Sequence, residues 1–288
     1  MGARRYLAAT TVAFGFYLAC GNDLERQGQL ERVRVLAIRA DPAELVLDPD
    51  GVVPPAPVQL SALSFAPDGG TPTVSYALCR PGANVYAPEV QCPGPDGLPL
   101  AGGVVDLSDP NIQAWLASDG GFVPGDPAQR EQLARGVLLN IGYLATDGTP
   151  GDRGTEIGVY GLSLRATRDP NHNPGIDEIF VHGSTPVQNQ RFPLNTTVTF
   201  TPSLTEGSIE TYVDANGQTQ TEMIVYSWFA TGAGKVEDFR SQEPFQGVGK
   251  RDSDYTTAKA PESVTLYVVA RDGRGGTGWI IRSFSEGD

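Results

Sequence analysis

Residues 264–273 read Val-Thr-Leu-Tyr-Val-Val-Ala-Arg-Asp-Gly, and this stretch decides the fold class. Every second residue at its centre is apolar, so an extended strand here has one apolar face, formed by Val264, Leu266, Val268 and Ala270. The run ends at Asp272 and Gly273, a pair typical of tight turns. Residues 279–284 then provide a second strand, and the two segments together predict a β-hairpin.

The same order of features occurs earlier in the chain. Residues 137–145 and 157–166 are long apolar segments separated by a Gly, Pro and Asp cluster, which predicts another closing hairpin. Residues 74–78 stand before that hairpin as residues 225–229 stand before the last one. We interpret the chain as a degenerate internal duplication. The predicted fold is all-β, with one sandwich over residues 31–168, a linker over 169–176 and a second sandwich over 177–288.

Two other local features are expected in the first sandwich. Residues 33–37 alternate like a strand, but Leu36 and Ile38 change the parity, which indicates a bulge or burial on both faces. Two short helices are predicted between strands, because Asp109-Pro110 and Asp126-Pro127 both pair a capping residue with a proline suited to the first helical turn. Gly136 is expected to end the second helix, and Trp115 to cover the core from the first.

A family resemblance rests on the second module. Trp228 on a third strand, followed by Ala260-Pro261 and then by residues 264–273, resembles the end of a bacterial immunoglobulin-like or PKD-like domain. The layout is also similar to predicted lipoproteins of myxobacterial type, with a strand over residues 35–40 and an Asn173-Pro174 linker. The resemblance implies tandem immunoglobulin-like sandwiches in which the aromatic residue of the third strand packs against the opposite sheet. The first module departs from it by having Tyr76 or Leu78 instead of tryptophan.

The N-terminus predicts export. Arg4 and Arg5 precede an uncharged, largely apolar run over residues 6–19, which is too short to span a bilayer as a helix and is typical of a signal peptide. Residues 17–20, Tyr-Leu-Ala-Cys, resemble a bacterial lipobox with Tyr17 in place of the usual leucine. The resemblance implies a signal peptide over residues 1–19, lipid attached to Cys20 and a tether over 20–30. A conventional signal peptide cut nearby is the alternative.

These features place the protein in a bacterial cell envelope, with the outer membrane favoured by Gly21 after the cysteine. The other two cysteines, Cys79 and Cys92, are an even pair in an oxidising compartment, so we expect a disulfide. Its closed loop would contribute about 3 kcal/mol on the chain-entropy account. A metal site is the competing interpretation, but two thiols without a nearby histidine suit zinc poorly.

Charge excludes one class of partner. The 288 residues carry a formal net charge of −13 at pH 7. Nucleic acids are bound mainly through Lys and Arg, so no nucleic-acid partner is expected. The membrane is expected to be contacted through the lipid anchor.

The linker offers a candidate calcium site. Residues 169–177 are similar to the calcium-binding linker of cadherins, and Asp169, Asn171 and Asn173 match its spacing. His172 replaces an acidic ligand, however, and no companion acidic motif precedes it. A simple interdomain turn is the alternative, because Asp-Pro and Asn-Pro pairs are typical of linkers. No other cofactor is expected.

No catalytic constellation is recognisable. The chain has two histidines, His172 and His182, and neither lies beside a nucleophile-elbow motif. Residues 271–278 contain Arg271, Arg274 and four glycines, which would suit either an anion cradle or a tight hairpin. The sequence therefore predicts a noncatalytic envelope lipoprotein whose modules contact a protein or glycan. The alternatives are a calcium-stiffened adhesin and, more distantly, a carbohydrate-active hydrolase.

Overall fold

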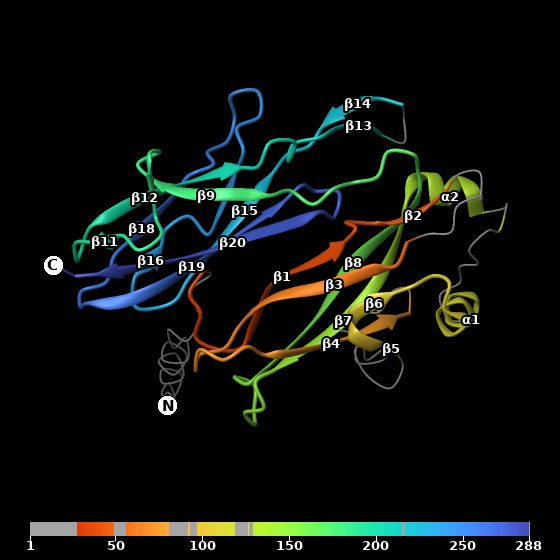
Figure 1. The fold of residues 1–288 in the computed structure, drawn as a ribbon, viewed down its shortest axis with the longest axis horizontal. Coiled ribbons are helices and arrows are strands. Elements are labelled where there is room, and N and C mark those ends of the chain that lie inside the picture. The colour runs from red at the N-terminus through yellow and green to blue at the C-terminus, as the bar shows by residue number, and fades with distance from the viewer. Residues whose placement is uncertain are drawn as a thin grey trace, which may run out of the picture.

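The computed structural model describes residues 28–48, 56–80, 92, 97–118, 126, 129–214 and 217–287. Within these ranges the chain forms two β-sandwiches (Figure 1). The expected signal peptide, Cys20 and the tether up to residue 27 lie outside them. Among the described residues, no helix has the length and apolar character needed to cross a membrane.

The first sandwich is built from residues 34–166. One sheet has the order β1 (Arg34–Asp41), β3 (Val58–Phe65) and β6 (Val104–Val105). The other has the order β2 (Leu45–Leu47), β8 (Thr155–Ala166), β7 (Val137–Thr146), β4 (Thr73–Cys79) and β5 (Leu98–Leu100). Inward residues of both sheets form one apolar core.

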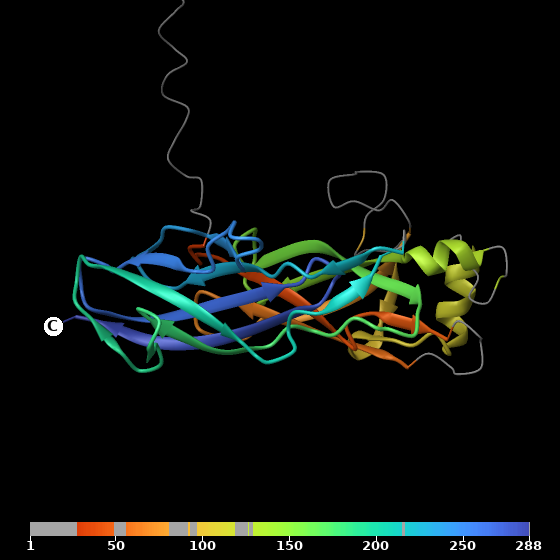
Figure 2. The same ribbon diagram turned by 90° about the horizontal axis from the view of Figure 1, so that it is seen from above.

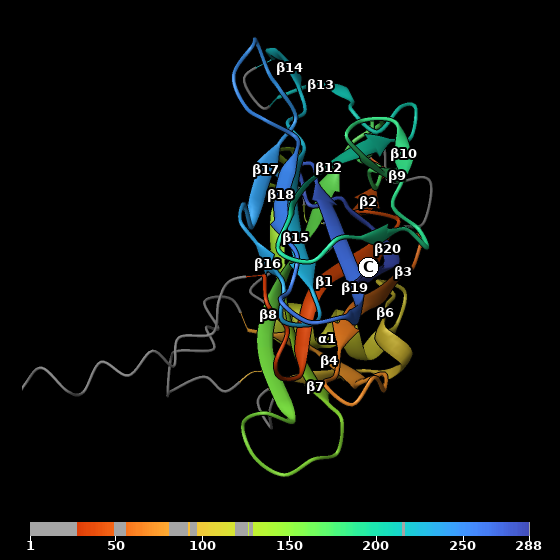
Figure 3. The same cartoon turned by 90° about the vertical axis from the view of Figure 1, so that its left-hand side faces the viewer.

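The second sandwich repeats this arrangement with residues 176–286. One sheet has the order β10 (Thr185–Pro186), β9 (Ile176–Val181), β12 (Thr197–Leu204), β18 (Ser253–Thr256) and β16 (Lys235–Val236). The other has the order β11 (Arg191–Phe192), β20 (Thr277–Glu286), β19 (Glu262–Arg271), β15 (Val225–Ala230) and β17 (Arg240–Gln242). A separate hairpin, β13 (Thr211–Val213) and β14 (Thr219–Thr221), projects from its side (Figure 3).

The strand order confirms an all-β fold of two immunoglobulin-like sandwiches in tandem. In each module a short early strand pairs in parallel with the last strand, β2 with β8 and β11 with β20. The last two strands form the predicted hairpin in both modules. Strands β4 and β15 also occupy equivalent central places, each beside the penultimate strand, as the predicted duplication requires. Trp228 on β15 is fully buried in the core, as the resemblance implied.

Two short helices lie in the first module, as expected. Helix α1 (Pro110–Ser118) begins at the predicted proline, and the Asp109 carboxylate accepts a hydrogen bond from the Asn111 backbone N–H at 2.8 Å. Trp115 packs half-buried against the core. Helix α2 (Arg130–Arg135) begins four residues after Asp126, later than the sequence indicated, and ends at Gly136 with a φ of 92°. A 3₁₀ turn, η1 (Ala101–Gly103), connects β5 and β6.

The parity change in β1 has both of the predicted causes. The pairing of β1 with β3 shifts register between Val35 and Ala37, which is a bulge. The strand is also buried on both faces, because Ile38 lies in the core of the first sandwich while Leu36 contacts the second sandwich. The Cys79–Cys92 disulfide is present, with its Cα atoms 5.8 Å apart.

The two sandwiches pack directly on each other. Figure 2 shows them staggered along the long axis of the molecule, with the helices at one end and the C-terminus at the other. The β1–β3 sheet contacts the outer face of β15, β19 and β20 through an apolar cluster formed by Leu30, Leu36, Ala37, Leu63, Phe65, Phe229 and Val269. We call this cluster the interface core. Val269 is fully buried here, so the two modules share an apolar cluster that is separate from the core of either sandwich. They do not meet only at the linker.

The expected tether also contributes to this contact. Gly28, Gln29 and Leu30 are described, and Gln29 forms a parallel bridge with Ala230 at the edge of β15. The Ala230 backbone N–H donates to the Gly28 carbonyl at 2.8 Å. The last three residues of the 20–30 segment thus lie against the second sandwich.

Candidate functional site

The linker between β8 and β9, residues 167–175, lies against both sandwiches. Asn173 joins three segments, because its amide nitrogen donates to the Ala40 carbonyl at 2.7 Å and its amide oxygen accepts from the Thr277 backbone N–H at 2.8 Å. Ala40 belongs to β1 and Thr277 begins β20. Asn173 therefore cross-links the first sandwich, the linker and the second sandwich.

Asn171 makes a second cross-link. It is 1% exposed, and its side-chain nitrogen donates to the Asp272 carboxylate at 3.0 Å. Its backbone N–H donates to the Glu44 carboxylate at 2.7 Å, and Glu44 also pairs with Arg165 at 3.0 Å. Buried carboxylates are tolerated when they are hydrogen-bonded and paired in this way. No motif or spacing in the sequence indicated Glu44, which lies 127 positions from Asn171.

We call the region where the linker and the two sandwiches contact one another the joint. A third set of polar contacts extends the joint to the β13–β14 hairpin. Arg274 pairs with Glu222 at 2.9 Å and with Glu210 at 3.3 Å, and it stacks over the Tyr212 ring at 4.3 Å. Glu210 in turn contacts His172 Nδ1 at 2.6 Å. Burial raises the pKa of Glu222 above its ordinary value. The hydrogen bonds that Glu222 accepts from the Glu210 backbone N–H and from Arg274 act in the opposite direction.

The glycine-rich turn between β19 and β20 is both a hairpin turn and an anion cradle. The backbone N–H groups of Arg274 and Gly276 donate to the Asp272 carboxylate at 2.7 and 3.0 Å. The anion in this cradle is therefore the side chain of the turn's own aspartate. Burial raises the pKa of Asp272, although the hydrogen bonds from Asn171 and from the turn act in the opposite direction.

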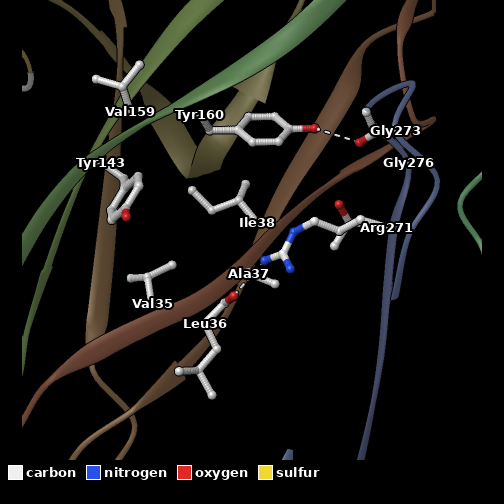
Figure 4. Close-up of a pocket in the computed structure, with 12 residues that line it drawn as sticks. Val35, Leu36, Ala37, Ile38, Tyr143, Val159, Tyr160, Arg271, Gly273 and Gly276 are labelled. Atoms are coloured by element: carbon white, nitrogen blue, oxygen red, sulfur yellow. Dashed lines mark hydrogen bonds between the residues drawn. The ribbon is translucent and has the colours of Figure 1, made fainter. Parts of the chain in front are cut away.

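Beside this turn the two sandwiches enclose a groove of about 380 Å³ (Figure 4). Its walls come from β1, from β7 and β8, and from the β19–β20 turn, and its lining residues are Val35, Leu36, Ala37, Ile38, Tyr143, Val159, Tyr160, Arg271, Gly273, Gly275, Gly276 and Thr277. We call it the interdomain groove. Its volume lies in the range of small-molecule sites.

Arg271 is the charged residue of this lining set. Figure 4 shows its guanidinium extending from β19 toward Leu36 and Ala37 on β1. It donates to the Leu36 carbonyl at 2.8 Å and to the Ser227 hydroxyl at 3.1 Å. Burial, and then the nearby charge of Arg240, lower the pKa of Arg271. Strand alternation predicts that Arg271 points away from the apolar face of β19. It does not predict that the other sandwich forms a groove on that side.

Tyr160 closes the groove on the side of the turn. Its hydroxyl donates to the Gly275 carbonyl at 3.4 Å, a long hydrogen bond between the two sandwiches. Burial, with a further contribution from Asp272, raises the pKa of Tyr160 to about 12, so its phenol is neutral at physiological pH.

The calcium candidates differ in how their side chains are used: both amide atoms of Asn173 are hydrogen-bonded, whereas the amide oxygen of Asn171 is buried without a hydrogen-bond partner in the described part of the chain. The side chains of Asn171 and Asn173 make the cross-links described above, and the Asp169 carbonyl accepts from Arg165 at 3.1 Å. Among the described residues, no group of three or more His, Cys, Asp or Glu side chains is arranged to hold a metal ion. Of the two histidines, His172 is exposed and His182 directly follows β9 with a φ of 49°.

The sequence matches no family model and no curated protein. Solved structures similar to the chain include the D00-D0 domain of intimin, at 9% identity and a TM-score of 0.23, covering 85% of this chain and 99% of that one. Mouse cadherin-23 EC22-24 is 11% identical with a TM-score of 0.21, covering 87% of this chain and 63% of that one. A nucleoside hydrolase-related protein from Saccharophagus degradans is 12% identical with a TM-score of 0.24, covering 43% and 28%.

The chain thus spans less than two thirds of the Saccharophagus and cadherin structures. TM-scores at this level carry no argument about function. The immunoglobulin-like assignment rests on the strand order of the two sandwiches themselves.

Proposed function

We propose that this protein is a noncatalytic, lipid-anchored component of a bacterial envelope whose paired sandwiches act as a contact module for a neighbouring protein or glycan. The observation that carries the proposal is the joint. Two modules held by an apolar interface core and by the cross-links of Asn171 and Asn173 keep their loops in fixed relative positions. Such a scaffold suits contact with a partner.

Several loops of the second sandwich expose apolar side chains. Val248 is 69% exposed and Phe245 is 44% exposed on the turn between β17 and β18, and Val213 is 60% exposed at the end of β13. Exposed apolar side chains of this size are typical of contact surfaces when they lie on loops held by a rigid scaffold.

The test is crosslinking in intact envelopes, followed by recovery of the protein with its neighbours. The proposal expects a reproducible neighbour, and it expects Cys20→Ala to release the protein from the membrane fraction. A double variant, Phe245→Ser with Val248→Ser, should weaken the crosslink without changing the melting temperature. The anchor would be contradicted if Cys20→Ala stayed on washed membranes as the wild type does. It would also be contradicted if the wild type itself were found in the soluble fraction.

Chelation separates this proposal from the calcium-stiffened alternative. If calcium stiffens the joint, EDTA should lower the melting temperature and calcium should restore it. If the protein contacts alone fix the joint, the melting temperature should be the same in EDTA and in calcium.

A further inference from the structure

The interdomain groove combines one cation with an apolar and aromatic wall. Its lining has Arg271 on one side, Tyr143 and Tyr160 on another, and Val35 and Ile38 along the floor (Figure 4). Its walls come from both sandwiches, so an occupant would touch residues from each. A carboxylate side chain is missing from the lining set, although the whole chain carries a net charge of −13.

Arg271 differs from three other largely buried arginines, although Arg39, which lies over the Trp279 ring at 4.8 Å, also contacts no carboxylate among the described residues. Arg165, Arg274 and Arg282 each contact a glutamate, at 3.0, 2.9 and 2.6 Å. Within the part of the chain that the structure describes, Arg271 contacts no carboxylate and donates to one carbonyl and one hydroxyl. A guanidinium has more N–H donors than these two bonds use, so further donors remain for an anion.

A second cation adds to the unbalanced charge. Arg240 on β17 lies opposite Ser227 of β15, and Ser227 accepts the hydrogen bond from Arg271. The two arginines therefore flank one serine on the same sheet, and their repulsion contributes to the lowered pKa of Arg271. An anion bound at Arg271 would relieve both the desolvation of its charge and this repulsion.

The other walls indicate what the anion is attached to. Tyrosine rings and apolar side chains pack against the C–H faces of a ring-shaped ligand, whereas an inorganic anion would leave them uncovered. Tyr160 is neutral at physiological pH and does not repel a carboxylate, although the buried Asp272 carboxylate lies near enough to contribute to its raised pKa.

We propose that the interdomain groove binds a uronic-acid unit of an acidic glycan, with its carboxylate on the Arg271 guanidinium and its sugar ring against Tyr143 and Tyr160. This assignment rests on the contact function proposed above and names glycan as the partner class. The charge-assisted contact with Arg271 provides affinity, and the aromatic wall selects a ring.

The test is calorimetric titration of the purified protein with methyl glucuronide, using neutral methyl glucoside and sodium sulfate as matched probes. We expect saturable binding of the glucuronide and about tenfold weaker binding of the glucoside, since one charge-assisted hydrogen bond is lost. Equal binding of sulfate and glucuronide would overturn the sugar assignment. Absence of glucuronide binding to the folded protein would overturn the site.

Two variants of the same residue separate charge from structure. Arg271→Gln keeps a polar side chain of shorter reach but removes the charge, so it should lose glucuronide binding. Arg271→Lys keeps the charge and should retain part of the binding. Arg251→Gln removes an exposed arginine elsewhere and should bind like the wild type.

Arg271 also hydrogen-bonds to the Leu36 carbonyl of β1, so its variants could change the structure as well as the binding. A variant on the opposite wall of the groove avoids this. Tyr143→Leu should weaken glucuronide binding and leave the Arg271 hydrogen bonds intact. Unchanged glucuronide affinity in both Arg271→Gln and Tyr143→Leu would place the sugar elsewhere. If Arg271→Gln still crosslinks to the same envelope neighbour while losing no sugar affinity, the contact function stands and the groove assignment fails.

Discussion

At the scale of single residues, the joint depends on side chains that act through both of their polar atoms. Asn173 donates to the Ala40 carbonyl and accepts from the Thr277 N–H, so one amide satisfies two backbone groups in different sandwiches. A buried backbone group without a partner is unfavourable, which makes this amide more important than an exposed one of the same type.

Asn173→Ala should therefore lower the free energy of unfolding by about 2 kcal/mol, because two backbone groups lose their partner together. Urea unfolding measures the change. Asn111→Ala, at an exposed position of α1, is the matched control and should change stability by less than about 0.5 kcal/mol. Equal effects of the two variants would show that the Asn173 cross-links contribute little.

Asp272 gives the joint a pH dependence with a definite sign. Burial raises its folded pKa above the ordinary 3.8, so the folded protein binds the Asp272 proton more tightly than the unfolded chain does. The stability linked to this group is fully present below about pH 3.8 and is lost as the pH rises through the folded pKa.

Asp272→Asn removes this titration. The melting temperature of the wild type minus that of Asp272→Asn should fall as the pH is raised from 4 toward 8 in steps of about one unit. Scanning calorimetry of both proteins in matched buffers measures the difference. A difference that grows with pH would mean that the folded pKa of Asp272 is lowered, contrary to the effect of its burial.

At the scale of elements, the start of β20 lies very close to the linker. A Cβ on Gly278 would overlap the carbonyl oxygen of Pro174, so the backbone approach here requires glycine. Gly161 on β8 is different, because a Cβ there would meet only the Leu138 side chain at 3.6 Å, an ordinary contact.

Gly278→Ala should destabilise the protein by about 1–3 kcal/mol, since the linker must move away from β20. Gly161→Ala is the control and should be close to neutral. Chemical denaturation gives both values, and the glucuronide titration of Gly278→Ala reports whether the groove also changes. A neutral Gly278→Ala would indicate that the linker has space to relax.

The elements themselves were largely predictable from the sequence, and their contacts were not. Period-two alternation predicted both closing hairpins, and the parity change at Leu36 predicted the bulge in β1. The disulfide was predicted from an even pair of cysteines behind a predicted signal peptide. The start of α2 was misplaced because the Asp126-Pro127 signal occurs four residues before the helix begins at Arg130.

The candidate site could not be predicted because it is formed by two modules. Arg271 and Tyr160 are 111 positions apart and line the same groove, and Glu44 and Asn171 are hydrogen-bonded over 127 positions. Alternation shows which face of a strand is apolar, but it does not show that the opposite face of β19 is covered by another sandwich. The cross-links of the linker's asparagines could not be predicted either, because they depend on Ala40 and Asp272.

At the scale of the whole molecule, the interface core joins the two sandwiches, and we expect them to unfold as one cooperative body. Val269 from the second sandwich and Leu63 from the first are both buried between the sheets. Phe65 and Tyr267 also pack edge to face across the joint, with ring centroids 6.4 Å apart. Apolar burial of this kind couples the unfolding of the two modules.

We expect a single thermal transition for the wild type and two transitions for Val269→Asp, because a buried, unpaired charge would separate the modules. Leu63→Asp, from the other side of the same core, should have the same effect. Ile281→Asp is the control, since Ile281 lies on β20 with 44% exposure. Calorimetry of the four proteins gives the number of thermal transitions of each. One transition in all of them would mean that the polar cross-links alone couple the unfolding of the two sandwiches.

The bridge between Gln29 and Ala230 has a mechanical consequence. Gln29 also hydrogen-bonds to Gly232, 203 positions later in the chain. A pulling load applied ahead of Gly28 would be borne first by the edge of β15 in the C-terminal sandwich, and only then by β1. The C-terminal sandwich is thus the first to carry tension from the N-terminal side, although it comes last in the sequence.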